Sequence, residues 1–344
     1  MKVIHITRGF GDYVIELLNA MSGLAETHIV LARQDEWLAE HLNGKVRVFK
    51  SDAPRVGNIL NLASLLSVIR YIHKEKPDVI HLQSGVVWEA MLTKAFRHIP
   101  CVITVHDITR HPVRKSLLAP PQRLLDFAAR HADGIIVHGD ALLRTARDRY
   151  PSRRIIRSLD HGVISRYGTG LAADEPRNNG ILLFGGVNTW KGIEYLIEAE
   201  PIIRESVPEA KIIVAGFTQD PDYYRGLVRE GQAVEMRLAR QSDDDVRALF
   251  EWADILVLPY IEASQSGVLQ LGFSFGIPSV VTDVGGLPDV ICDERNGFVV
   301  PPRDPAALAR AIVRLLLDVD LRRQIIGAVA SERETRFNWD SIAR

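Results

Sequence analysis

Short apolar runs alternate with amphipathic helical patterns along the whole chain, and this alternation restricts the possible folds more than any other feature. The runs are rich in β-branched residues and almost continuously apolar, as parallel strands covered by helices on both faces require. Ten runs are predicted strands: Lys2–Thr7, Thr27–Ala32, Asp78–Leu82, Val102–Val105, Gly134–Val137, Ile181–Phe184, Lys211–Ala215, Ile255–Leu258, Ser279–Thr282 and Phe298–Val300. The sequence therefore predicts an α/β protein with doubly wound parallel sheets.

The chain has 344 residues, which is long enough for two hydrophobic cores. A polar stretch with several glycines, Ser165–Gly180, interrupts the alternation near the middle and is the predicted linker. We expect one Rossmann-like domain over residues 1–165 and a second over residues 166–330. A C-terminal helical segment over residues 331–344 is expected to pack back toward the first domain.

The formal net charge is −1, but the two halves differ in sign. Residues 1–170 carry 24 Lys+Arg and 16 Asp+Glu, whereas residues 171–344 carry 18 and 27. A basic first half suits an anionic partner such as a membrane surface or a diphosphate-linked acceptor. A solvated face that opposes its acidic counterpart explains the same asymmetry.

The chain has two cysteines, Cys101 and Cys292, which lie far apart in the sequence. This excludes a disulfide framework and a paired-cysteine metal motif. We find no signal-peptide pattern at the start and no stretch of about 18 apolar residues. We expect a cytoplasmic protein with no nucleic-acid partner, whose membrane contact would be peripheral, at the inner face of the cell membrane.

Two features of the first half lie at predicted carboxyl ends of strands, where such sheets bind ligands. Gly9 and Gly11 follow the first strand and would let the backbone approach a ligand, although a tight turn explains them equally well. His106 and Asp107 follow the strand that ends at Val105. Only this position distinguishes His106 from the other histidines, most of which we expect at the surface or in the core.

In the second half, Gly185, Gly186 and Lys191 lie in the turn after the first predicted strand. Glycines beside a lysine are typical of a phosphate-binding turn, but the P-loop spacing is absent. An ordinary strand–helix loop with an exposed lysine remains the alternative.

The segment Glu262–Gln270 is the most informative part of the sequence, and it predicts a helix that starts near Ser266. The N–H groups at the start of that helix and its positive dipole end suit a diphosphate. A serine N-cap explains the serines equally well, but it does not explain Glu262.

The acidic run Ser242–Asp245 invites a metal-site interpretation. Serine followed three residues later by an acid, at the start of an amphipathic pattern, is a capping box. We therefore predict a helix start there rather than a metal site.

Taken together, these residues resemble the retaining glycosyltransferases of the GT-B fold, family 4 (glycosyl transferases group 1). The likeness covers nearly the whole chain. It extends to four further pieces: Asp283–Pro288, Asn296–Gly297, Pro301–Pro302 and Phe337–Asp340. The resemblance implies two Rossmann-like domains that face a central cleft, with the acceptor bound mainly by the first and a nucleotide-sugar donor mainly by the second.

The resemblance also implies roles for individual residues in a metal-independent sugar transfer. His106, Lys191 and Glu262 are the implied catalytic residues: Glu262 holds the donor sugar hydroxyls, Lys191 neutralises the diphosphate and His106 touches the sugar. The implied donor-binding residues are Gly9, Gly11, Gly185, Gly186, Arg237, Ser266, Gly267, Val268 and Gln270. No cofactor is expected, and the implied acceptor is a glycan or a lipid-linked saccharide of cell-surface polysaccharide synthesis.

Two positions depart from the family pattern. Gln270 stands where a second glutamate usually binds the ribose, and an amide can still make hydrogen bonds there. Gly186 stands where an arginine usually contacts the diphosphate, and Arg237 or Arg240 is a candidate to replace it. A non-catalytic nucleotide-binding or regulatory protein of this fold and a sugar-nucleotide epimerase are therefore kept as alternatives.

Overall fold

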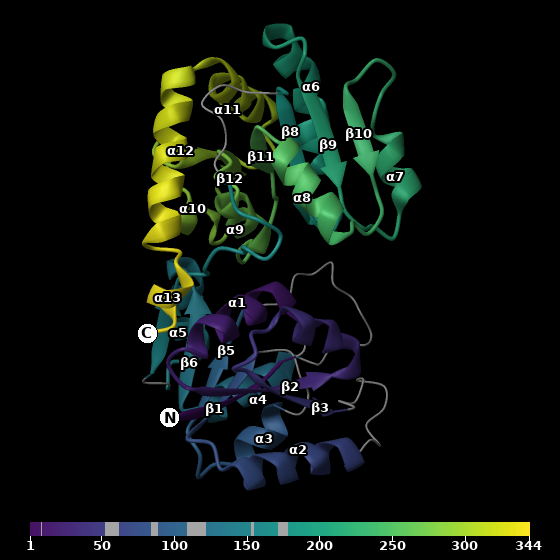
Figure 1. Cartoon of the computed structure of the whole chain (residues 1–344). Helices are drawn as coiled ribbons and strands as arrows, with labels where there is room; N and C mark the ends of the chain where they lie inside the picture. The colour runs from purple at the N-terminus through teal and green to yellow at the C-terminus, as the bar shows by residue number, and fades with distance from the viewer. Residues whose placement is uncertain (8, 52–61, 84–88, 109–121, 153–154, 171–177) are drawn as a thin grey trace. The chain divides into compact units, whose positions relative to one another are not determined.

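The computed structural model describes residues 1–7, 9–51, 62–83, 89–108, 122–152, 155–170 and 178–344. These residues form two compact units (Figure 1). The first unit is Met1–His161 together with Trp339–Arg344, and the second is Gly162–Asn338. In the described part of the chain, no helix is long and apolar enough to cross a membrane.

The first unit is built on a seven-stranded parallel sheet in the order β3-β2-β1-β4-β5-β6-β7. Its strands are β1 Lys2–Ile6, β2 Glu26–Ala32, β3 Arg47–Ser51, β4 Val79–Gln83, β5 Cys101–Thr104, β6 Gly134–His138 and β7 Ile156–Leu159. Its helices are α1 Gly11–Met21, η1 Arg33–His41, α2 Leu62–Glu75, α3 Glu89–Ala95, α4 Gln122–His131, α5 Asp140–Arg149 and α13 Trp339–Ile342.

The second unit is built on a six-stranded parallel sheet in the order β10-β9-β8-β11-β12-β13. Its strands are β8 Gly180–Phe184, β9 Lys211–Ala215, β10 Val234–Arg237, β11 Ile255–Leu258, β12 Ser279–Thr282 and β13 Gly297–Val300. Its helices are η2 Thr189–Lys191, α6 Ile193–Ser206, α7 Pro221–Gly226, α8 Asp243–Trp252, α9 Gly267–Ser274, α10 Leu287–Val290, α11 Pro305–Leu317 and α12 Val319–Glu334.

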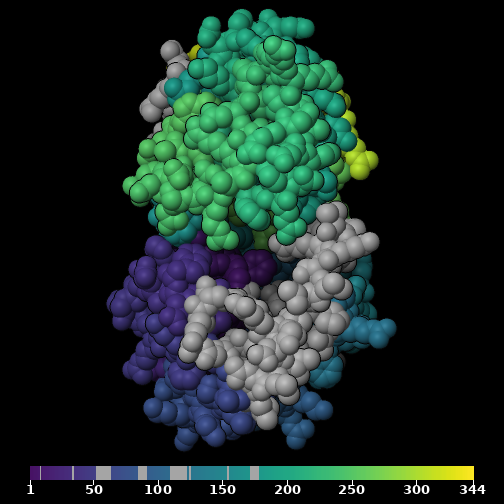
Figure 2. Space-filling model, turned by 90° about the vertical axis from the view of Figure 1, so that its right-hand side faces the viewer, coloured from purple at the N-terminus to yellow at the C-terminus, as the bar shows by residue number. Residues whose placement is uncertain are grey.

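The predicted fold of two doubly wound parallel sheets is confirmed, and each of the ten predicted strands is present within one residue of its predicted bounds. The prediction missed β3, β7 and β10, all of which lie at the edge of a sheet. Figure 2 shows the face of the second unit on which β10 and α7 lie. Edge strands keep one side in solvent, so their sequences carry polar residues and lack the apolar run that marks a central strand.

The chain divides earlier than predicted, between His161 and Gly162 rather than after residue 165. The described part of the expected linker belongs to the second unit: the Ser274 hydroxyl donates to the Gly168 carbonyl (3.3 Å), and the Gly170 N–H donates to the Ser274 carbonyl (3.0 Å). Polar and glycine-rich composition predicted a connection between units, but tertiary partners hold this stretch against α9.

The C-terminal segment also differs from its predicted bounds of 331–344. Residues 331–338 belong to the second unit, where Phe337 is part of the hydrophobic core. Trp339–Arg344, with the helix α13, belong to the first unit (Figure 1). There Trp339 packs in the core beside Tyr13, with ring centroids 5.1 Å apart.

The predicted cap at Ser242 is confirmed. The Ser242 hydroxyl accepts a hydrogen bond from the Asp245 N–H (3.2 Å), and the Asp245 carboxylate accepts one from the Ser242 N–H (3.1 Å). The acidic run therefore starts α8, as a capping box does.

A buried ion pair joins α12 to the sheet of the second unit. Arg322 is fully buried, and its Nη1 donates to the Asp254 carbonyl (3.0 Å), while its Nη2 lies 3.6 Å from Asp254 Oδ1. Asp254 Oδ2 in turn accepts hydrogen bonds from the N–H groups of Asn178 (2.8 Å) and Gly180 (3.1 Å), where β8 begins.

We predict that Arg322→Met lowers the free energy of unfolding of the second unit by about 3–5 kcal/mol, because it leaves the buried Asp254 carboxylate without its cation. Urea denaturation measures this change. The matched control is Arg323→Met: Arg323 is exposed and pairs with Asp320, so its loss should change the free energy of unfolding by about 0.5 kcal/mol or less. Equal effects of the two variants would contradict a structural role for the buried pair.

Candidate functional site

The turn after β8 forms one side of a polar site in the second unit. Gly185 has a φ of +104°, a conformation that favours glycine. A Cβ atom placed on Gly185 would lie 3.1 Å from Val268 Cγ2 and 3.8 Å from Lys191 Nζ. The turn, the lysine of η2 and the first turn of α9 are therefore direct neighbours.

Tyr260 connects Lys191 to the start of α9. The Lys191 ammonium donates a hydrogen bond to the Tyr260 hydroxyl and lies 3.9 Å from the centroid of its ring. The same hydroxyl is 3.3 Å from Ser266 Oγ, and Tyr260 is only 2% exposed. Tyr260 was not among the predicted site residues, although it lies between the end of β11 and Glu262.

Helix α9 starts at Gly267, as predicted, with Ser266 at its N-cap position. The Ser266 side chain makes no capping hydrogen bond and lies instead beside Tyr260. The first N–H groups of a helix have no partner within that helix, and they carry its positive dipole end. The serine-cap alternative therefore does not describe Ser266, and the helix start suits an anion.

The loop that carries Glu262 is held by backbone contacts on two sides. The Ile261 N–H donates to the Trp190 carbonyl (2.8 Å), and the Gly286 N–H donates to the Ser264 carbonyl (2.9 Å). A Cβ atom on Gly285 would overlap the carbonyl oxygen of Ala263. Glu262 is thus an exposed residue on a loop whose backbone is fixed.

Three other predicted donor contacts have distinct surroundings. Gln270 is 1% exposed, and its Oε1 has no hydrogen-bond partner among the described residues. Arg237 ends β10, where its Nε donates to Glu235 Oε1 (2.6 Å). Gly186 has no positive φ, and a Cβ atom there would meet only the Asn188 amide, at 3.4 Å. The structure thus leaves space for a side chain at Gly186.

In the first unit, the glycine turn and His106 are in contact through Phe10. Phe10 lies between Gly9 and Gly11, has a φ of 56° and stacks on the His106 ring, with centroids 3.8 Å apart. A Cβ atom on Gly11 would collide with the side chains of Trp37 and Leu38, so close packing against η1 requires glycine there. Steric need explains Gly11 without a ligand.

His106 belongs to a row of buried polar side chains on one face of the first sheet. Successive residues of a strand point to opposite faces, and the residues between them pack in the apolar core with α2–α5. The row consists of His5, His81, Gln83, Thr104, His106 and His138. It lies beside Tyr13 of α1, whose ring is 4.8 Å from that of His106 and 5.0 Å from that of His138.

Burial keeps these imidazoles neutral. It lowers the pKa of His81 to about 4, and, with the nearby His161, it lowers the pKa of His138 to about 3. The pKa of His106 is also well below its usual range because of burial and then of His138, whose ring centroid is 5.1 Å away. His106 is therefore a neutral hydrogen-bonding group at pH 7 and not a cation.

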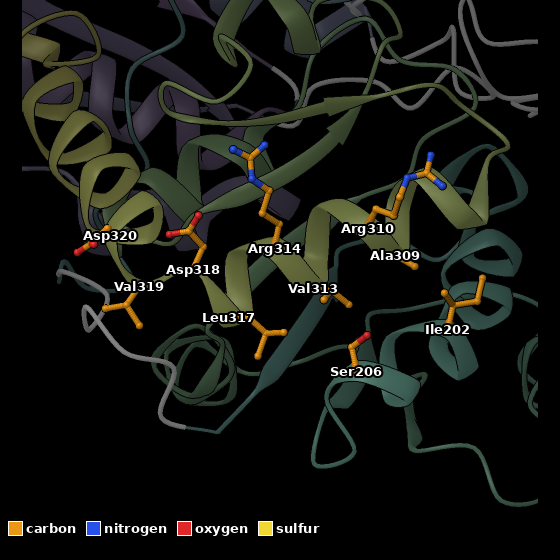
Figure 3. Close-up of a pocket in the computed structure, with 10 residues that line it drawn as sticks. All are labelled: Ile202, Ser206, Ala309, Arg310, Val313, Arg314, Leu317, Asp318, Val319 and Asp320. Carbon is orange, nitrogen blue, oxygen red and sulfur yellow. The ribbon is translucent and has the colours of Figure 1, made fainter.

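Two further features lie away from these residues. A hollow of about 630 Å³ lies between α6 and α11 and is lined by Ile202, Val313 and Leu317 (Figure 3). Because α6 starts beside Lys191, its last turns, and with them the hollow, lie at the opposite end of the unit from the candidate site.

In the part of the chain that the structure describes, Glu26, His28 and Glu75 form the group with metal-ligand spacing. The Lys2 ammonium lies within 3.5 Å of both carboxylates and pairs with them.

The comparisons with known proteins identify the family. Residues 178–318 match the family model described as "Glycosyl transferases group 1", and residues 7–163 match "Glycosyltransferase Family 4". A D-inositol 3-phosphate glycosyltransferase of Xylanimonas cellulosilytica is 32% identical over 300 residues, which covers 77% of this chain and 70% of the relative. The chain belongs to the family 4 glycosyltransferases.

Other relatives match over shorter parts of their length. An uncharacterized glycosyltransferase of Methanocaldococcus jannaschii is 32% identical over 189 residues, which is 54% of this chain and 47% of that protein. The chain thus spans about half the length of this relative.

A solved structure shows the fold. The crystal structure of Anabaena HepE in complex with UDP-glucose has a TM-score of 0.74 at 18% identity, and the match covers 100% of this chain and 97% of the HepE chain. This likeness shows that the glycosyltransferase has the GT-B fold.

The structure brings the predicted residues together in two sets. Gly185, Lys191, Ser266 and Val268 are neighbours in the second unit, and His106 lies beside the Gly9–Gly11 turn in the first. That the two sets meet across a cleft stays a prediction.

We predict that acid destabilises the first unit of this glycosyltransferase selectively, since the buried histidines whose pKa is lowered, among them His81 and His138, lie in it. Unfolded histidines titrate near pH 6.5, whereas His81 and His138 stay neutral in the fold down to about pH 4 and about pH 3. Their stabilising contribution is complete above pH 6.5. Below it, the unfolded state binds more protons, and His81 and His138 each lower the free energy of unfolding by about 1.4 kcal/mol per pH unit until the pH reaches their pKa in the fold.

Hydrogen exchange at pH 7 and pH 5, resolved by peptide and corrected for intrinsic rates, measures this difference. Amides of β4 and β6 should lose protection more than those of β9 and β11. His138→Gln should weaken the pH dependence, whereas substitution of the exposed His131 by Gln should leave it unchanged. An equal loss of protection in both units would contradict the prediction.

Proposed function

We propose that the protein is a retaining glycosyltransferase that moves a sugar from a nucleoside-diphosphate sugar to an acceptor hydroxyl without a metal ion. One observation carries the proposal: the Lys191 ammonium, the Tyr260 and Ser266 hydroxyls and the start of α9 converge beside Gly185. A cation, hydroxyl donors and a helix N-terminus at one place suit a diphosphate.

The donor class receives support from the solved structures. HepE has been crystallised with UDP and with UDP-glucose. A uridine diphosphate sugar is therefore the first donor to test.

The chemistry follows from the charge that develops during transfer. The bond between the anomeric carbon and the diphosphate oxygen breaks, and negative charge grows on the leaving group. Lys191 and the N–H groups of Gly267 and Val268 stabilise that charge. The acceptor oxygen then bonds to the anomeric carbon on the face that the diphosphate leaves, and its proton passes to a phosphate oxygen. The sugar passes through an oxocarbenium-like state, and its configuration is retained.

The remaining residues hold the sugar. Glu262, on its fixed loop, accepts hydrogen bonds from donor sugar hydroxyls, and the neutral His106 contacts the same sugar. Gln270 takes the place of the ribose-binding glutamate, and its Oε1 is available for such a contact because no described residue uses it.

The acceptor that we propose is a glycan or lipid-linked saccharide of cell-surface polysaccharide synthesis. Arg144 and Arg147 of α5 and Arg157 of β7 are exposed in the first unit and support a peripheral contact with an anionic membrane. Residues 110–115 of the same half are also basic in sequence, with Arg110, Arg114 and Lys115, but they lie outside the described residues.

We predict that Lys191→Ala and Glu262→Ala each lower kcat/KM for the donor at least about tenfold, which corresponds to roughly 1.4 kcal/mol of transition-state stabilisation. Release of nucleoside diphosphate from a panel of donors, with and without acceptors, measures the activity. Lys211→Ala and Glu230→Ala are matched controls, because both residues are exposed and neither lies in the loops of the site. Activity near that of the wild type in both site variants would refute the assignment.

Gly186 stands where the family usually has an arginine, and restoring that arginine gives a gain-of-function prediction. Because a side chain fits at Gly186, Gly186→Arg should place a second cation beside the diphosphate and tighten the binding of a nucleoside diphosphate about tenfold or more. Calorimetric titration measures this affinity, and Gly186→Gln is the uncharged control. If both variants bind alike, the diphosphate lies elsewhere. If nucleotide binds but no donor is ever consumed, the protein is the non-catalytic nucleotide-binding alternative.

A further inference from the structure

The Lys191 ammonium is held by an aromatic residue rather than by a carboxylate. It donates a hydrogen bond to the Tyr260 hydroxyl and lies 3.9 Å from the centroid of the Tyr260 ring. Other cations of the second unit, Arg237, Arg295 and Arg314, each pair with a glutamate. An aromatic face attracts an ammonium group without neutralising its charge. The positive charge of Lys191 therefore stays available to an anion.

Backbone contacts keep Tyr260 and Lys191 beside each other. Tyr260 is 2% exposed, and its carbonyl accepts a hydrogen bond from the Thr282 hydroxyl (2.6 Å). A Cβ atom on Gly192 would overlap the carbonyl oxygen of Pro259, so the chain next to Lys191 touches the chain next to Tyr260. The two side chains therefore start from backbone segments that are packed together.

The hydrogen bond to Tyr260 leaves most of the donor capacity of Lys191 unused. An ammonium group has three donors and no acceptor, so two donors remain for a ligand. They lie beside the glycine turn, because a Cβ atom on Gly185 would be 3.8 Å from Lys191 Nζ. A long lysine side chain loses conformational entropy when it is ordered, and here the contact with Tyr260 orders it before a ligand binds.

We propose that Tyr260 is a positioning residue: it holds the Lys191 ammonium in place for the diphosphate of the donor and acts on that diphosphate through Lys191. The identity of the anion rests on the proposed function, whereas the contact between Tyr260 and Lys191 does not. The hydroxyl and the face of the ring both contribute to this contact.

A double-mutant cycle on nucleotide affinity tests the coupling. Calorimetric titration with UDP is carried out on the wild type, Tyr260→Phe, Lys191→Ala and the double variant. Tyr260→Phe keeps the ring but removes the hydroxyl, and it should raise the Kd for UDP about three- to tenfold. In the Lys191→Ala background, the same change should alter the Kd less than about twofold, because the group through which Tyr260 acts is already absent.

Two further variants complete the series. Tyr260→Leu removes the ring as well as the hydroxyl and should raise the Kd for UDP more than Tyr260→Phe does. Tyr224→Phe is the matched control: Tyr224 is also a buried tyrosine of the second unit, but it lies in α7 and its ring contacts Tyr223. Its loss of a hydroxyl should leave the affinity for UDP unchanged.

The contact between Tyr260 and Lys191 is also measurable without a ligand. Lysine ammonium protons exchange rapidly with water unless a hydrogen bond protects them. In ¹H–¹⁵N spectra of protein labelled with ¹⁵N-lysine, at mildly acidic pH and low temperature, the wild type should show a protected ammonium signal that is absent in Lys191→Ala. Tyr260→Phe should lose this signal, and Tyr224→Phe should keep it.

Additive effects in the cycle would overturn the proposal, since they are expected if the Tyr260 hydroxyl contacts the diphosphate itself or only supports its loop. A Lys191 ammonium signal that is unchanged in Tyr260→Phe would overturn it as well, and so would a wild type that does not bind UDP. If the cycle and the spectra are as expected but no donor is consumed, the proposed function fails while the role of Tyr260 stands. If a donor is consumed and the effects are additive, the proposed function stands and the positioning role fails.

Discussion

The parallel direction of the strands is the constraint on which the rest of this structure depends. Every pairing among the described strands of both sheets is parallel, so all carboxyl ends of one sheet meet at one edge. In the second unit, this brings the turn after β8 and the loop after β11 together, although Gly185 and Ser266 are far apart in the sequence. The site that we propose for the diphosphate is a consequence of that geometry and of the polar residues that follow the strands.

The two units use the same architecture with different interiors. Central strands of the second sheet, such as β11, are buried and apolar on both faces, as usual for parallel sheets. In the first sheet, the face opposite α2–α5 is mixed: Ile29 and Leu31 of β2 pack in an apolar core with α1, and the same face carries buried histidines, Gln83 and Thr104. Burying polar groups costs free energy unless they are hydrogen-bonded. The hydrogen bonds of Gln83 and Thr104 offset part of that free energy. The proposed binding of a sugar, which has many hydroxyl groups, gives a physical reason for keeping polar side chains on this face.

The candidate site divides into parts that sequence reasoning found and parts that it missed. Lys191, Gly185 and the start of α9 were predicted because strand ends and a helix start have local signatures. Tyr260 and Gln83 were not, because an aromatic residue or an amide near a strand end has no pattern of its own. Their importance comes from the partners beside them, His106 and Lys191, which are remote in the chain. The edge strands β3, β7 and β10 were missed because exposure removes the apolar signal, whereas β13, the fourth edge strand, keeps an apolar run and was predicted.

The sequence by itself determined the two parallel sheets, the order of their central strands along the chain and the start of the helix that we propose binds the diphosphate, because hydrophobic periodicity and helix starts are local properties. Only the tertiary structure decided that the stretch after Gly162 belongs to the second unit, that Trp339 completes the core of the first, and that His106 is neutral and joined to Gln83. Burial, register and hydrogen-bond polarity are set by neighbours that a linear pattern does not reveal.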